Sequence, residues 1–182
     1  MDPGGAPANP VVPALPVQFW GLDPVFWAPV KLFVGDARKL MRYPHTAGAF
    51  RAHSHPLSRV EIVGCVVELV SKATREIFVV DDGTGVIMCC RPVSAGGGAA
   101  GGPSLGDLVR VRGSMGEFRG NREIHITDIS RVRDPNAEML HWVQAVKLDR
   151  SVYSKPSAIH SEVKVNAMVA GAAARACARV CK

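Results

Sequence analysis

Short hydrophobic runs separated by tight turns fill the middle of the chain, from residue 59 to residue 133. The runs are rich in Val and Ile, and some of them alternate hydrophobic and polar residues, as strands with one buried face do. Asp82-Gly83-Thr84-Gly85 and Phe118-Arg119-Gly120-Asn121 stand between runs, and such glycine-containing segments favour hairpin turns. The pattern predicts five strands, at Val60–Val70, Glu76–Asp81, Val86–Arg91, Asp107–Glu117 and Arg122–Val132.

Five short strands are too few for a large sandwich, but they can close into a small barrel of the OB type. Gly64 lies in the middle of the first strand, where an OB barrel must bend and where a glycine permits the bend. We therefore expect an all-β fold with flanking helices, in which a five-stranded OB-fold barrel is followed by a C-terminal α-helix. Barrels of this type bind single-stranded nucleic acid or oligosaccharides, or they pair with another OB subunit.

The last two strands differ in how regular their alternation is. Val109 and Val111 share one face of the fourth strand. In the fifth strand Ile124 and Ile126 share a face with Asp128, whereas Ile129 falls on the opposite face. Either a bulge near Thr127-Asp128 shifts the pattern, or Ile129 points outward toward a partner.

A helix is predicted directly after the barrel. Asp134 can cap the free N–H groups of a first turn, and Pro135 suits that turn. The apolar residues that follow at helical spacing either pack back on the barrel or form an interface with a second subunit. We predict the second of these, an interface with another subunit, for Met139, Trp142, Val143 and Val146.

The remaining segments are predicted from composition and spacing. Residues 1–19 are rich in Pro, Gly and Ala and are expected to be disordered, residues 20–153 form the OB-fold domain with its N-terminal extension and C-terminal helix, and residues 154–182 form a basic, Ala-rich tail. Within the domain, the spacing of apolar residues predicts a short helix from Val30 to Met41. Composition predicts a polar loop from Tyr43 to Ser58 and a flexible, Gly- and Ala-rich excursion from Val93 to Gly106.

The positive charge of the chain lies mainly outside the barrel. The net charge is +6, yet residues 59–133 hold ten basic and nine acidic residues, whereas residues 155–182 hold five basic and one acidic. A stand-alone binder of phosphate backbones is usually more basic than this barrel. The side chains that could contact nucleic acid, or that could equally be solvated surface charge, are Lys72, Arg75, Arg91, Arg110, Arg112, Phe118, Arg119 and Arg122.

No arrangement of residues predicts catalysis, a metal or a cofactor. Asp81-Asp82 precedes a glycine turn and is expected to cap it. His53/His55, Cys89/Cys90 and Cys177/Cys181 lack the paired spacing of a zinc site, so we expect no metal and no enzyme activity. The odd number of cysteines, five, and the lack of a signal-peptide pattern favour a reducing compartment, the cytosol or the nucleus. No apolar run of the sequence is long enough to span a membrane.

Several blocks of the chain together resemble one family. They are Trp20-Gly21-Leu22-Asp23-Pro24-Val25-Phe26 with Lys31-Leu32, Val80-Asp81-Asp82-Gly83-Thr84-Gly85, Val109-Arg110-Val111-Arg112-Gly113-Ser114, Arg122-Glu123-Ile124-His125, and Asp134-Pro135-Asn136-Ala137-Glu138 with His141-Trp142. Over about residues 20–153 the chain is similar to the Stn subunit of the CST (Ctc–Stn–Ten) telomere complex, in its short plant-type form with a single OB fold.

The resemblance implies a nuclear protein at telomeres. Its partners would be a small Ten-type OB subunit, a large Ctc-type subunit, telomeric single-stranded DNA through the complex, and DNA polymerase α–primase. The assembly would protect chromosome ends and support fill-in of the complementary strand. In this family the barrel and the helix after it contact the Ten subunit, which would place Met139, Trp142, Val143 and Val146 at that interface.

Two departures from the family bear on DNA binding. Arg91-Pro92 stands where vertebrate relatives have a Trp, and Ile129-Ser130 replaces aromatic residues late in the fifth strand. Both changes reduce base stacking and favour DNA binding as a property of the complex. The alternative functions are a replication protein A-like OB subunit and an autonomous single-stranded DNA-binding protein.

Overall fold

The computed structural model describes residues 15–43, 46, 48–93, 102–157 and 159. Residues 1–14 of the expected disordered N-terminus, most of the glycine-rich excursion and residues 160–182 of the tail lie outside the described residues. Leu15 is buried, at 1% exposed, and the indole N–H of Trp20 donates to its carbonyl oxygen at 2.9 Å. The folded part of the chain therefore includes residues 15–19, which the sequence assigned to the disordered terminus.

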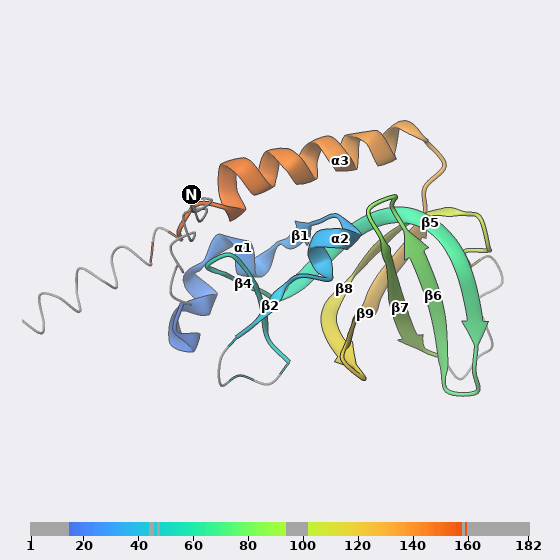
Figure 1. The fold of residues 1–182 in the computed structure, drawn as a ribbon, viewed down its shortest axis with the longest axis horizontal. Coiled ribbons are helices and arrows are strands. Elements are labelled where there is room, and N and C mark those ends of the chain that lie inside the picture. The colour runs from blue at the N-terminus through green and yellow to red at the C-terminus, as the bar shows by residue number, and fades with distance from the viewer. Residues whose placement is uncertain (1–14, 44–45, 47, 94–101, 158, 160–182) are drawn as a thin grey trace, which may run out of the picture.

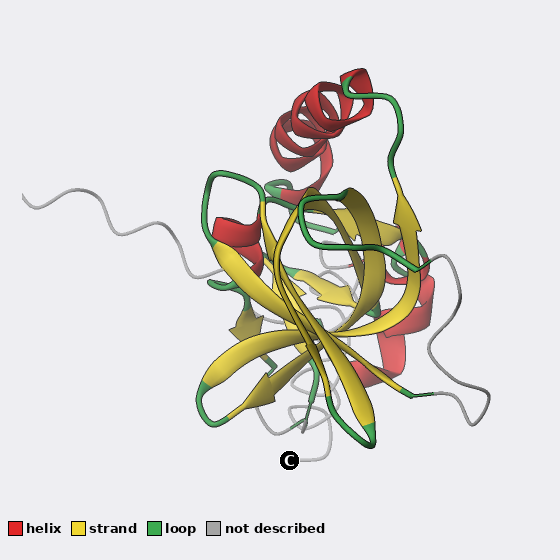
Figure 2. Cartoon of the chain, turned by 90° about the vertical axis from the view of Figure 1, so that its right-hand side faces the viewer, coloured by secondary structure: helices red, strands yellow, loops and turns green. Residues whose placement is uncertain are grey.

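A closed barrel of five strands forms the body of the molecule (Figures 1 and 2). Neighbouring strands pair in the order β5, β6, β7, β9 and β8, and β8 pairs again with β5 to close the ring. All these pairs are antiparallel except β7 with β9, which is parallel. The predicted OB barrel is confirmed, and the strands are β5 (Arg59–Ser71), β6 (Arg75–Asp81), β7 (Val86–Pro92), β8 (Leu108–Phe118) and β9 (Asn121–Arg131).

Gly64 marks the position where β5 changes partners. The strand pairs with β8 from Val60 to Cys65 and with β6 from Cys65 onward. A Cβ atom at Gly64 would lie 2.5 Å from the carbonyl oxygen of Asp81, which is closer than van der Waals contact. The two partner strands can therefore approach β5 here only because the residue has no side chain.

The irregular alternation in the last strand is a bulge. Arg112 pairs with Asp128 and the next residue of β8 pairs with Ile126, so Thr127 is an extra residue in β9. The Thr127 hydroxyl donates to the carbonyl oxygen of Arg112 at 3.1 Å. Because the extra residue reverses which positions of β9 face inward, Ile129 packs against the core. This confirms the first of the two sequence interpretations, a bulge near Thr127-Asp128.

The barrel interior holds the apolar residues that alternation predicted. Val109 and Val111 are fully buried, as their shared face in the sequence indicated. Side chains from the other four strands complete this core, among them Ile62, Phe78, Val80, Cys89 and Ile124.

The helix predicted at Val30–Met41 is wrong. This segment instead contains the strand β1 (Pro29–Lys31), parallel to β5, a single helical turn α2 (Val34–Ala37), and the strand β2 (Met41–Arg42). The amide of Val34 donates to the Asp82 carboxylate at 2.7 Å, and the amide of Gly35 donates to the Thr84 hydroxyl at 2.9 Å. The turn that contains Asp81-Asp82 therefore caps the start of α2. Within the turn, the two Asp side chains also accept hydrogen bonds from the amides of Gly83 and Thr84.

The polar loop predicted from Tyr43 to Ser58 is also wrong in part. It contains β3 (Phe50–Ala52) and β4 (His55–Leu57), which form a small antiparallel sheet with β2. Ahead of it, the chain forms the 3₁₀ helix η1 (Val17–Leu22) and the helix α1 (Pro24–Trp27). These elements make an N-terminal extension beside the barrel (Figure 1).

A buried ion pair holds the extension together. Asp23 caps α1 by accepting from the Val25 amide at 2.9 Å, and its second carboxylate oxygen lies 2.7 Å from Nδ1 of His55. Nε2 of His55 lies 2.9 Å from the carbonyl oxygen of Lys155. Because both partners of the ring are acceptors, both ring nitrogens donate, and His55 is a cation.

The C-terminal helix α3 (Asn136–Leu148) lies across the outside of the barrel, above β1 and α2 in Figure 1. Its predicted start is confirmed in part: the Asp134 side chain accepts from the Asn136 amide at 2.9 Å, although Pro135 precedes the first helical residue. The π-helical turn η2 (Asp149–Tyr153) continues it. Among the described residues, no helix combines the length and the apolar character needed to cross a bilayer.

The ion pair of Asp23 and His55 predicts how stability depends on pH. Burial is the largest single influence and disfavours both charges, but their mutual hydrogen bond, their charge attraction and hydrogen bonds with the backbone together outweigh it, so the pKa of Asp23 is lowered and the pKa of His55 is raised. The Asp23 contribution is lost as pH falls through its folded pKa, and the His55 contribution is lost as pH rises through its folded pKa. The stabilisation is therefore fully present between about pH 4 and 6.5, the unfolded values.

We predict that Asp23→Asn lowers the free energy of unfolding by about 3 kcal/mol at pH 5.5, since it leaves a buried cation unpaired. The loss should shrink at higher pH as His55 becomes neutral, and urea unfolding followed by circular dichroism measures it. The control is His53→Gln, because His53 forms an exposed pair with Asp149 and should change stability little. An equal loss in both variants would contradict the prediction.

Candidate nucleic-acid and partner interfaces

Phe118 ends β8 with its ring between two arginines. The guanidinium carbon of Arg75 lies 5.3 Å from the ring centroid, and that of Arg119 lies 5.2 Å from it. Phe118 is 40% exposed. Exposed aromatic rings beside guanidinium groups form surfaces on which nucleic-acid bases stack. We call Arg75, Phe118 and Arg119 the Phe118 cluster.

Two turns of the barrel bring this cluster together. Arg119 and Gly120 have φ of 52° and 82°, the left-handed conformations of a tight hairpin turn between β8 and β9. Arg75 begins β6, and the amide of the exposed Lys72 donates to its carbonyl oxygen at 2.9 Å across the β5–β6 turn. Four of the eight predicted nucleic-acid residues therefore lie at the same end of the barrel.

The other four predicted residues have acidic partners. Arg91 donates to Glu76 at 2.6 Å, and Arg122 pairs with Glu117. Arg110 and Arg112 lie beside Glu61, as described next. Each of the four thus has an acidic neighbour within the chain, and their contact with nucleic acid stays a prediction.

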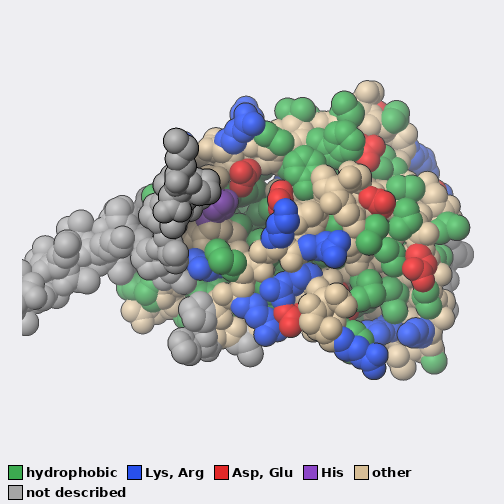
Figure 3. Space-filling model, viewed as in Figure 1, with side chains coloured by type: hydrophobic (Ala, Val, Ile, Leu, Met, Phe, Trp, Pro, Cys, Tyr) green, Lys and Arg blue, Asp and Glu red, His purple; other side chains and the backbone are tan. Residues whose placement is uncertain are grey.

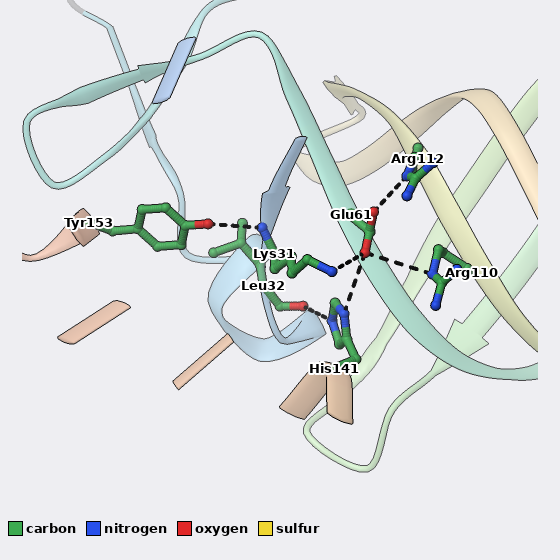
Figure 4. Close-up of polar contacts among 7 residues, drawn as sticks. All are labelled: Lys31, Leu32, Glu61, Arg110, Arg112, His141 and Tyr153. Carbon is green, nitrogen blue, oxygen red and sulfur yellow. Dashed lines mark hydrogen bonds and ion pairs between the residues drawn. The ribbon is translucent and has the colours of Figure 1, made fainter. Parts of the chain in front are cut away.

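Glu61 carries a buried negative charge, and side chains from several elements gather around it (Figure 4). Its side chain is 2% exposed, although it lies on the outer side of β5, where β1 and α3 cover it. Lys31 donates to one carboxylate oxygen at 2.8 Å, and Arg112 donates to the other at 2.6 Å. Nε of Arg110 lies 3.8 Å away. Burial alone would raise the pKa of Glu61, but the hydrogen bonds from Lys31 and Arg112 lower it overall, so the group stays ionised.

His141 attaches α3 to the same centre. Its Nε2 donates to the carbonyl oxygen of Leu32 at 3.2 Å, and its Nδ1 lies 3.8 Å from Glu61. Burial lowers the pKa of His141, so the ring is neutral at pH 7. Further along, the hydroxyl of Tyr153 accepts from the Lys31 amide at 3.3 Å. These contacts fix α3 and η2 against β1.

The face of α3 that points away from the barrel is apolar. His141 and Ala145 are the buried residues of the helix. The exposed fractions on the opposite side are 58% for Met139, 56% for Leu140, 63% for Val143 and 38% for Val146. We call these four residues the α3 stripe, and Figure 3 shows hydrophobic side chains along that upper edge of the molecule.

Trp142 borders the α3 stripe rather than belonging to it. It is partly exposed and lines a groove with Val143 and Val146. Three basic residues, Lys147, Arg150 and Lys155, form the rest of this groove together with Ser151. The predicted interface residues are thus near one another, while Leu140 was missed, although its spacing of three residues from Val143 could have indicated it.

The fold and the exposed faces define the class of the protein. A closed barrel of five strands, in which the third and fifth strands pair in parallel and the first and fourth strands close the ring, has the OB fold. A chain of the Schizosaccharomyces pombe Stn1–Ten1 complex superposes with a TM-score of 0.61 at 22% identity, covering 72% of this chain and 96% of that one. A chain of a replication protein A heterotrimer bound to single-stranded DNA gives 0.61 at 24% identity, covering 69% and 98%. At identities this low, the two structural matches establish only that the fold is shared.

The sequence identifies the family. Residues 37–175 match the family described as telomere regulation protein Stn1. The CST complex subunit STN1 of Arabidopsis thaliana is 34% identical over 146 residues, covering 68% of this chain and 90% of that protein. The human subunit is 32% identical over 184 residues, covering 86% and 49%. The chain belongs to the Stn1 family, as its blocks predicted, and spans about half the length of its vertebrate relatives.

The contacts of Glu61 predict its importance for stability. Glu61→Gln should lower the free energy of unfolding by about 2–3 kcal/mol, because it removes a charge that accepts hydrogen bonds from two cations. Urea unfolding at pH 7 measures the change.

The matched control is Glu76→Gln, which breaks an ion pair of the same 2.6 Å length between Arg91 and a more exposed carboxylate. This pair should contribute at most about 1 kcal/mol. Equal effects of the two substitutions would show that Glu61 has no special role.

Proposed function

We propose that the chain is the Stn-type OB subunit of a telomere-capping CST complex and pairs with a small Ten-type OB subunit through α3. The observation that carries the proposal is the α3 stripe, in which four apolar side chains are between 38% and 63% exposed. A helix normally buries such a stripe. Here the helix buries His141 and Ala145 instead, which leaves the stripe available for another chain.

The energetics favour a protein partner on this face. Burying the remaining surface of each half-exposed Leu, Met or Val contributes about 1 kcal/mol, and methionine is enriched at interfaces. Membership of the Stn1 family supports a Ten-type partner, because two solved structures of similar fold contain Stn1 with Ten1.

We further propose that telomeric single-stranded DNA contacts the Phe118 cluster and Lys72 in the assembled complex. In OB barrels the surface near the first and last hairpin turns is the usual ligand-binding face. The near-neutral barrel and its single exposed aromatic platform favour weak binding by the chain alone.

The same family membership supports the wider roles of the proposal. These are a nuclear location at telomeres, a large Ctc-type partner, and assistance to DNA polymerase α–primase during fill-in of the complementary strand. They rest on the relatives named as CST complex subunits.

The partner interface is tested by Met139→Glu combined with Val143→Glu. The double variant should bind a Ten-type subunit at least about tenfold more weakly, because two charges would be buried in an apolar contact. Isothermal titration calorimetry with the purified partner measures the affinity.

The matched control is Val86→Glu combined with Leu105→Glu, which changes two residues that are 45% and 66% exposed and lie outside α3. It should bind the partner like the natural chain. Undiminished binding by the α3 variant would exclude the proposed interface.

The DNA-binding face is tested by Phe118→Ala in the complex with a Ten-type subunit. Loss of one stacking platform should weaken binding to telomeric single-stranded DNA by about 1–3 kcal/mol. Fluorescence anisotropy at two salt concentrations measures affinity and salt dependence, and Arg119→Ala should reduce the salt slope by about one.

Arg133→Ala is the control for charge. Arg133 is exposed and follows β9, at the opposite end of that strand from the β8–β9 turn, so its loss should leave affinity nearly unchanged. Equal losses for Phe118→Ala and Arg133→Ala would point away from the cluster. Tight binding by the chain without a partner would favour the autonomous DNA-binding protein instead.

A further inference from the structure

A thiol, an imidazole and a carboxylate meet on β7 and β9. Cys90 lies on β7, directly opposite His125 in the parallel pair, and Glu123 lies two residues before His125 on the same side of β9. Sγ of Cys90 is 3.4 Å from Nδ1 of His125, and Oε1 of Glu123 is 3.6 Å from Nε2 of the same ring. One ligand atom from each residue lies within 4.8 Å of the other two.

Two of these three side chains are enclosed by the barrel and the third is exposed. Cys90 and Glu123 are buried, at 7% and 5% exposed, while His125 faces solvent. The imidazole lies against Gly116 of β8, where a Cβ atom would be 2.2 Å from Nε2. A glycine at this position therefore leaves the space that the ring occupies.

Glu123 is a buried carboxylate that lies beside a histidine. Among the described residues its only ion-pairing partner is His125, which is charged only if protonated. Buried charges are normally paired with a cation or coordinate a metal. Glu61, by contrast, has two cations within 3 Å.

We propose that Cys90, Glu123 and His125 bind a zinc ion. Sulfur, imidazole nitrogen and carboxylate oxygen are the ligands that zinc accepts, and a fourth position would be open to water or to another ligand. Because one ligand atom of each residue lies within 4.8 Å of the other two, small side-chain movements would bring all three to one zinc ion with bonds of about 2.0–2.3 Å. Rotation of the exposed imidazole would bring one nitrogen to the metal.

A catalytic thiol is a poorer interpretation of the same three residues. Burial and the neighbouring Glu123 charge raise the pKa of the Cys90 thiol, whereas a nucleophilic cysteine needs a lowered pKa and access to solvent. A bound cation would instead use both the sulfur and the carboxylate.

The test uses the full chain with Cys177→Ser and Cys181→Ser, so that the two tail cysteines cannot bind the metal. Titration with zinc chloride against a chromophoric chelator should show one equivalent bound. Affinity should fall at least tenfold in Cys90→Ala and in His125→Ala, and should be unchanged in Cys65→Ala, which removes a free cysteine of β5.

Cobalt substitution gives an independent readout of the ligands. Co²⁺ should produce a thiolate-to-metal charge-transfer band that disappears in Cys90→Ala. His125→Ala keeps the test decisive if Cys90→Ala does not fold, since the imidazole is largely exposed. Absence of stoichiometric binding, or binding unchanged by Cys90→Ala and His125→Ala, would overturn the proposal and leave a hydrogen-bonded trio without a metal.

Discussion

The charge of Glu61 must be neutralised inside the protein, and much of the structure depends on how this is done. A carboxylate that is 2% exposed would be very costly without cations nearby. Lys31 supplies one from β1, Arg110 and Arg112 supply two from β8, and His141 brings α3 to the same point. The barrel and the N-terminal extension are thereby connected through one side chain, and the C-terminal helix is held beside it by the hydrogen bond between His141 and the Leu32 carbonyl.

This connection assigns different tasks to different faces of the barrel. Arg110 and Arg112 are directed to Glu61, whereas Arg75 and Arg119 lie beside the exposed ring of Phe118. The helix α3 packs against the barrel through a histidine and an alanine. Its larger apolar residues therefore point outward. The proposed stacking surface and the proposed protein-binding surface therefore use different residues.

The sequence predicted the barrel well, because alternation, Gly64 and the changed parity at Ile129 are local signals of strands, a bend and a bulge. It failed for Val30–Met41, where burial of Val30, Leu32 and Val34 has the period of a strand, and where contacts with Asp82 and Thr84, about fifty residues away, decide the conformation. For the sites, the spacing on α3 indicated three of the four stripe residues. The Glu61 contacts and the Cys90, Glu123 and His125 group were missed, since strand pairing brings together residues that are far apart in the chain.

The central claim is that the outer face of α3 is covered by a partner while the Phe118 cluster remains open for DNA. Hydroxyl-radical footprinting of the chain, alone and with a Ten-type subunit, tests both halves at once, because Met139 and Phe118 are both reactive and at least 40% exposed. We expect the partner to protect Met139 from oxidation and to leave Phe118 reactive. Protection of Phe118 with no change at Met139 would contradict it.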